Sequence, residues 1–143
     1  MLTSTLTLLR DELKEFLTPI FTKSSFGVKV CKLVDTQGKT ILNKDQPEVV
    51  ITLMNIQEER NMHQSRTSNP GQPYCLNLML LFSVHERADE SVTSEEAHLE
   101  TMMLLDGVLE FFQRHSTFNT HSHPNLPEGI QYLQFMLASE DLR

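Results

Sequence analysis

The side chains best suited to chemistry are three histidines late in the chain, His115, His121 and His123. The motif His121-Ser122-His123 could present two imidazoles to a metal ion. A zinc site in a protein normally uses three or four well-placed ligands, often with cysteine among them. Both cysteines of this chain fall in segments that we expect to be strands, far from the histidines in sequence. A solvated connector is therefore the preferred interpretation, and a small metal-binding enzyme using the three histidines stays as an alternative.

Glu58 and Glu59 are the other candidates for catalysis, because two carboxylates can divide acid and base roles. Adjacent residues of a strand point to opposite faces, so these two carboxylates cannot converge on one substrate. Arg60 faces the same side as Glu58 and could form an ion pair with it or across an interface. The sequence also contains no Gly-rich phosphate-binding loop, no GxSxG motif and no CxxC pair. We therefore predict that the protein is not an enzyme, and we assign it no catalytic, cofactor-binding or metal-binding residue.

The two glutamates belong to the end of a long predicted strand. Residues 49–56 (VVITLMNI) are apolar on both alternating faces, which is typical of a central strand covered on both sides. The continuation is polar on both faces, so the strand must leave the core and project into water or into a partner. We predict a contact surface made of the polar loop over residues 62–73 and of Gln57, Glu58, Glu59, Arg60 and Asn61. A protruding hairpin that is simply solvated explains the same pattern equally well.

The overall composition limits the classes of partner. The chain has 143 residues and a net charge of −7, with an isoelectric point near 5.3. These values argue against nucleic-acid binding, which needs clustered Lys and Arg. The N-terminus does not resemble a signal peptide, and no segment approaches the roughly 20 apolar residues of a membrane span. We expect a soluble protein made in the cytoplasm, without a membrane partner, in which Cys31 and Cys75 are buried free thiols.

Hydrophobic periodicity and turn signals divide the chain into helices and strands. The predicted elements are a helix from the N-terminus to about Leu17, where Pro19 stops it; an edge strand over 28–34 with a return over 40–42; the long strand beginning at 49; a second central strand over 74–84, antiparallel to the first; a helix from Thr93 to about His115; a polar loop over 116–129; and a last strand over 130–137. The two long strands exceed the usual length, so their tips should extend past the layer that the helices can cover.

Each predicted helix has one apolar stripe. In the first helix the stripe consists of Leu2, Leu6, Leu9, Leu13, Phe16 and Ile20. In the second it consists of Leu104, Leu105, Val108, Phe111 and Phe112, widened by Ala97, Met102 and Leu109. Thr93 and Glu96 form a capping box at the start of the second helix, and Glu110 and Arg114 are spaced for an ion pair near its end.

These elements predict an α+β fold. We expect one mainly antiparallel sheet of four to five strands, with the N-terminal helix and the long second helix packed on it. Residues 1–143 would form a single domain.

A series of motifs gives the chain a family resemblance. The motifs, in order, are residues 9–13 (LRDEL), 49–60 (VVITLMNIQEER), 73–82 (PYCLNLMLLF), 109–113 (LEFFQ) and 126–130 (LPEGI). The series covers nearly the whole chain and resembles the tail-terminator, or cap, proteins of phage-tail-like extracellular contractile injection systems of the antifeeding-prophage type. Similar proteins usually continue past the last strand with a further helix and strand. This chain ends at Arg143, so we expect a tail-terminator-like domain that lacks those two elements.

The resemblance implies a structural role. Such proteins form a six-fold ring at the end of the tail distal to the baseplate, where they stop polymerisation of the inner tube and tie the last sheath layer to it. The implied partners are further copies of the chain in a hexameric ring, the tail sheath protein and the inner tube protein. The implied location is the cytoplasm on synthesis, followed by assembly into a particle that lysis can release. A stand-alone adaptor or interaction module with no role in tail assembly stays as a second alternative.

Overall fold

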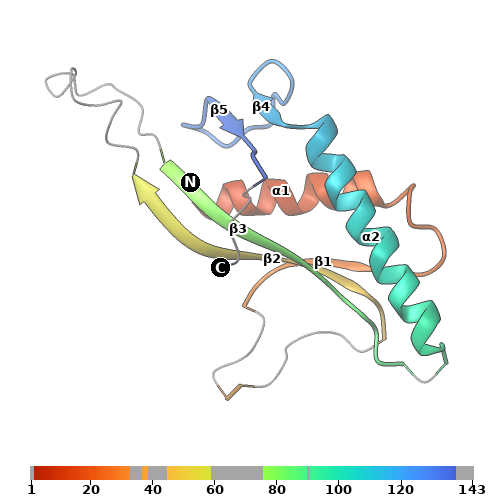
Figure 1. Ribbon diagram of the computed structural model, residues 1–143. Coiled ribbons are helices and arrows are strands. Elements are labelled where there is room, and N and C mark those ends of the chain that lie inside the picture. Colours follow the sequence, from red (N-terminus) through yellow and green to blue (C-terminus); the bar gives the residue numbers. More distant parts are fainter. Residues whose placement is uncertain (1, 33–36, 39–44, 59–75, 90, 138–143) are drawn as a thin grey trace, which may run out of the picture.

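Two α-helices pack on one face of a small β-sheet (Figure 1). The computed structural model describes residues 2–32, 37–38, 45–58, 76–89 and 91–137. Its elements along the chain are α1 (Leu2–Leu17), β1 (Gly27–Val30), β2 (Glu48–Glu58), β3 (Leu76–His85), α2 (Ser94–Arg114), β4 (Thr117–Asn119) and β5 (Tyr132–Gln134). The described residues thus form an α+β fold of two layers, as the order of predicted elements indicated.

α1 has the bounds that the apolar periodicity predicts. Leu9, Leu13 and Leu17 are buried at intervals of four residues, so they form one stripe that joins the hydrophobic core. Pro19 cannot continue the helix, and the chain turns away after Leu17. Ile20 lies beyond the helix and is exposed, so its assignment to the buried stripe is wrong.

The main sheet is mixed and has three strands in the order β1-β2-β3. β1 runs parallel to β2, with Val28 opposite Val49, and β3 runs antiparallel to β2, with Phe82 opposite Ile51. β1 lies at an edge, as predicted, but it ends at Val30. β3 was expected to be central, yet within the described residues it is the other edge. The predicted return over 40–42 and the loop over 62–73 lie outside the described residues.

A second, two-stranded sheet accounts for the end of the chain. β4 and β5 pair antiparallel, with Phe118 opposite Leu133. The predicted fold of one mainly antiparallel sheet with four to five strands is therefore wrong, because the last strand pairs with β4 instead of joining the main sheet. β4 forms inside the segment that we expected to be a polar loop, where the fully buried Phe118 anchors the backbone to the core.

α2 begins and ends where the sequence predicts. The Thr93 hydroxyl accepts a hydrogen bond of 3.1 Å from the amide of Glu96, which confirms the first half of the capping box. The expected ion pair forms near the other end, where Arg114 Nη2 lies 2.8 Å from Glu110 Oε1. The buried residues of α2 are Ala97, Glu100, Thr101, Leu104, Gly107, Val108 and Phe111. Met102 and Leu109 were expected to widen this stripe, but both are exposed.

A glycine allows the two helices to approach closely. Gly107 of α2 faces Leu17 of α1, and a methyl group added at Gly107 would lie 2.4 Å from Leu17 Cδ2. Leu17 is itself fully buried, so its side chain has little room to move. The lack of a side chain at Gly107 therefore sets the distance between α1 and α2.

Aromatic rings join the helices to both sheets. The Phe16 ring of α1 lies 5.4 Å from the Phe111 ring of α2, and the Phe82 ring of β3 lies 4.8 Å from the Phe112 ring. Phe111 also approaches Phe118 of β4, at 6.2 Å between ring centroids. Edge-to-face pairs of this kind stabilise a core beyond the area that they bury. One continuous core therefore includes residues of α1, α2, the main sheet and β4.

Candidate interaction surface

The two long strands leave the core together. Val49, Val50 and Ile51 are buried, whereas β2 is exposed from Met54 onward. The prediction that residues 49–56 are covered on both sides is therefore wrong for the last three of them. We call the paired residues 52–58 and 76–81 the β2–β3 arm. Figure 1 shows both strands continuing past the helix layer, as their predicted length indicated.

The arm carries a row of exposed apolar side chains. Between 40 and 57% of the surface of each residue in this row is accessible: Met54, Ile56, Leu76, Met79 and Leu81. Single exposed apolar residues are ordinary, but several on one projecting element form a candidate interaction surface. The sequence prediction missed these residues, because their apolar character was taken as a sign of burial.

A β-bulge determines which face each arm residue occupies. Leu53 is opposite Leu80 and Asn55 is opposite Met79, so Met54 is an extra residue between the two pairs. Directly opposed residues in an antiparallel pair project from the same face of the sheet. After the bulge, each side chain of β2 therefore lies on the opposite face of the sheet from the one that alternation before Met54 would give it.

Ile56 gains its position from this bulge. It is opposite Leu78, and Leu78 alternates with Leu80, whose side chain packs against the core. Ile56, Leu76 and Leu78 therefore continue the core-facing side of the sheet beyond the helices. Met79 and Leu81 lie on the other side, so the arm presents apolar groups on both of its faces.

The structure describes two of the five predicted contact residues. Gln57 is opposite Asn77 and Glu58 is opposite Leu76, and both are exposed at the end of the arm. Glu59, Arg60 and Asn61 lie outside the described residues. The two described polar residues therefore lie beside the apolar ones at the end of the arm, where Leu76 is opposite Glu58.

The histidines take part in packing. The His115 ring lies 5.1 Å from the Phe111 ring, and the His123 ring stacks on Phe118 with ring centroids 3.9 Å apart. His123 Nε2 also lies 3.9 Å from Glu12 Oε2. His121 is exposed, and its backbone amide donates to Asn119 Oδ1 in a turn. In the part of the chain that the structure describes, no group of three His, Cys, Asp or Glu side chains could hold a metal ion.

One buried charge lies at the base of the arm. The Glu48 side chain, at the start of β2, is fully buried, and Lys29 Nζ of β1 lies 3.0 Å from its Oε1 atom. Cys31 follows Lys29 by two residues and is only partly buried, so the expectation of a buried thiol is met in part. Burial raises the pKa of Cys31; Lys29 opposes this effect and Glu48 adds to it. Cys75 lies outside the described residues.

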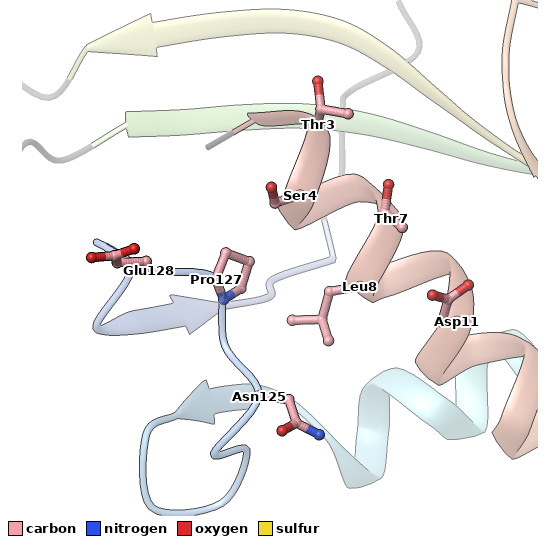
Figure 2. A pocket seen from close by; sticks show the side chains of 8 residues that line it. All are labelled: Thr3, Ser4, Thr7, Leu8, Asp11, Asn125, Pro127 and Glu128. Carbon is pink, nitrogen blue, oxygen red and sulfur yellow. The ribbon is translucent and has the colours of Figure 1, made fainter.

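An open hollow of about 440 Å³ lies between α1 and the segment before β5. Figure 2 shows Thr3, Ser4, Thr7 and Asp11 along α1, with Glu128 on the other side. The lining residues provide hydroxyls and carboxylates but include no histidine, cysteine, lysine or arginine. Such a lining can accept and donate hydrogen bonds.

No helix among the described residues has both the length and the apolar character that crossing a membrane requires.

Comparison with known proteins identifies the family. The Pvc16 N-terminal domain matches residues 4–143, which is almost the whole chain. No curated protein matches the chain. The match agrees with the resemblance carried by the sequence motifs, and it supports a structural role in a contractile injection system. The chain therefore belongs to the Pvc16 N-terminal domain family, which is associated with phage-tail-like particles of the antifeeding-prophage type.

Proposed function

We propose that the protein is a tail-terminator cap, which ends the inner tube and sheath of a contractile injection system as a ring distal to the baseplate. The observation that carries this proposal is the β2–β3 arm, an exposed apolar projection on a domain of this family. A ring requires each subunit to contact its neighbour, and an exposed apolar arm can make such a contact.

Electrostatics favours this kind of contact. Each copy carries a net charge of −7, so long-range repulsion opposes the assembly of identical subunits. Apolar contact and backbone pairing must therefore hold the ring together. The arm offers apolar residues on both faces. Between Leu76 and Val84 the edge strand β3 has no charged residue and no proline to discourage pairing.

The geometry of the arm suits a closed ring. A projection on one side of a subunit that fits a different surface of the next makes a heterologous contact, and such contacts close into rings when the rotation between subunits allows it. In the proposed hexamer, each arm contacts the next subunit, and the polar end from Gln57 to Asn61 contacts that subunit or the sheath. The inner tube and sheath proteins are the other proposed partners.

The proposed role is structural, without catalysis, cofactor, metal, nucleic acid or membrane. The subunit would be made in the cytoplasm and enter a particle that lysis can release. Its chemistry is that of an assembly interface.

Two arm variants test the proposal. Ile56→Asp places a charge in the apolar row, and Glu58→Lys reverses the charge at the polar end. We expect Ile56→Asp to abolish rings and to leave inner tubes without a defined length, as seen by electron microscopy of particles. Glu58→Lys, or Arg60→Glu in the segment beyond, should weaken capping without unfolding the subunit. Tyr132→Ser is the matched control, because Tyr132 is also a large exposed residue but belongs to β5, which is not part of the arm.

The proposal fails if particles that contain Ile56→Asp have normal rings and tubes of normal length. Circular dichroism of each variant shows whether the subunit is folded, so a misfolded variant is not mistaken for a failed contact.

A further inference from the structure

A second exposed apolar surface lies on α2. Leu99, Met102 and Leu109 are between 38 and 54% exposed. At 3.6 residues per turn, they point away from the buried residues Leu104 and Val108 of the same helix. Their spacings of three and seven residues put them on one line along the helix, the pattern of a seam that packs against another helix.

Acidic side chains accompany this line. Glu95 precedes Leu99 by four residues and Asp106 lies between Met102 and Leu109, and both carboxylates are exposed. We call these five residues the α2 outer stripe. The one arginine or lysine of α2 is Arg114, whose guanidinium lies 2.8 Å from Glu110. Along α2 the stripe therefore combines apolar and acidic side chains. Lys23, which lies outside the helix, lines a hollow together with Glu96 and Leu99.

The stripe and the arm are separate surfaces. Figure 1 shows α2 on the side of the molecule away from the end of the arm. α2 contacts β3 through Phe112, which packs on Phe82 near the other end of the strand. A contact made by the arm therefore leaves the stripe available to a different partner.

We propose that the α2 outer stripe docks an amphipathic helix of a different particle protein, one whose apolar seam is flanked by Lys or Arg. This proposal rests on the proposed function in one respect, namely that the partner belongs to a contractile injection particle. A second copy of the chain is the wrong occupant. Two stripes packed on each other would bring Glu95 and Asp106 close to like charges, and the described residues of the arm include Glu58 but no lysine or arginine that could pair with them. Basic flanks would instead place opposite charges beside both carboxylates.

Two synthetic helical peptides probe this chemistry directly. Both carry leucine at the seam positions, one flanked by lysine and the other by glutamate. Fluorescence anisotropy with the full chain should show that the lysine peptide binds about tenfold more tightly at low salt. The difference should nearly vanish at about 1 M salt, where the screening length is only about 3 Å.

Matched variants locate the binding site. Leu99→Ser combined with Leu109→Ser should weaken binding of the lysine peptide about tenfold, whereas Tyr132→Ser should not change it. Glu95→Lys combined with Asp106→Lys should reverse the preference between the two peptides. Equal binding of both peptides overturns the proposal, as does unchanged binding to the folded double serine variant.

Photo-crosslinking tests the occupant in assembled particles. A photoreactive benzoylphenylalanine replaces Leu109, and the same group at Tyr132 serves as the control. We expect Leu109 to crosslink to a Lys- or Arg-flanked helix of another particle protein. A crosslink to a second copy of the chain, or no crosslink, overturns the proposal. If the particles are capped but Leu109 forms no crosslink, the docking proposal fails and the cap proposal stands. If Leu109 forms the crosslink but the particles are uncapped, the cap proposal fails and the docking proposal stands.

Discussion

The ammonium of Lys29 lies 3.0 Å from the carboxylate of Glu48, across the parallel pair of β1 and β2. The Glu48 side chain is 0% exposed and that of Lys29 is 42% exposed, so the two partners differ in their access to water. Among the described residues, Lys29 is the charged residue that pairs with this buried carboxylate. The pair fixes the start of β2, from which the arm projects.

Unequal burial predicts unequal effects of removing each partner. Lys29→Met leaves a charged carboxylate buried without compensation and should lower the free energy of unfolding by about 2 kcal/mol. Glu48→Gln should have a smaller effect, because Lys29 can turn toward water. Urea unfolding of both single variants and the double variant measures this difference. An equal or larger loss for Glu48→Gln would contradict the account.

Gly107 should not tolerate even a methyl group. Alanine at an exposed helix position would stabilise α2 by about 1 kcal/mol relative to glycine. Here the new methyl group would meet the buried Leu17 at 2.4 Å, so we expect Gly107→Ala to destabilise the protein by about 1–3 kcal/mol. Gln113→Ala, at an exposed position of the same helix, is the control and should have little effect. Stabilisation by Gly107→Ala in thermal unfolding would show that the two helices are not packed this closely.

The cap of α2 gives a third prediction. Thr93→Ala removes the oxygen that accepts from the Glu96 amide and should lower the free energy of unfolding by about 1 kcal/mol. Thr93→Ser keeps a hydroxyl at the same position and should retain most of the stability. The cap would be unimportant if both variants unfolded at the same urea concentration as the parent protein.

Cys31 supplies a prediction about pH. Burial raises its pKa above the ordinary cysteine value, so in a Cys75→Ser background its alkylation should need a higher pH than that of an unfolded cysteine. The folded state then binds this proton more tightly than the unfolded state does. Its contribution to stability is therefore present below the ordinary cysteine pKa and is lost as pH rises through the raised value.

Iodoacetamide labelling rates measured against pH, with and without urea, test this prediction for Cys31. A folded-state midpoint at or below the urea value would contradict it.

Local signals in the sequence predicted the helices well. Pro19 and the leucine stripe gave the bounds of α1, and the Thr93–Glu96 spacing gave the start of α2. Each of these features depends on residues within about one helical turn of one another. In α2, periodicity did not separate buried from exposed apolar residues, because apolar side chains occur nearly all around this helix. Met102 and Leu109 were assigned to the wrong side for this reason.

Strand pairing and coverage could not be predicted in the same way. β1 pairs parallel with β2, and β5 pairs with β4, through contacts between residues far apart in sequence. The bulge at Met54 changes the face of Ile56, and alternation alone cannot show an inserted residue. Whether Ile56 is buried depends on how far the helices extend over the sheet. Gln57 and Glu58 at the end of β2 are exposed, as their polar character predicted, while the apolar residues beside them were taken for core.

The oligomeric state of the purified protein, alone and with the inner tube and sheath proteins, tests the cap proposal most directly. Analytical ultracentrifugation gives the mass of the assembly, and electron microscopy shows where it binds. The account predicts a hexameric ring that binds one end of the tube and prevents further polymerisation. A stable monomer that is unaffected by either protein, with tubes growing freely in its presence, would contradict it.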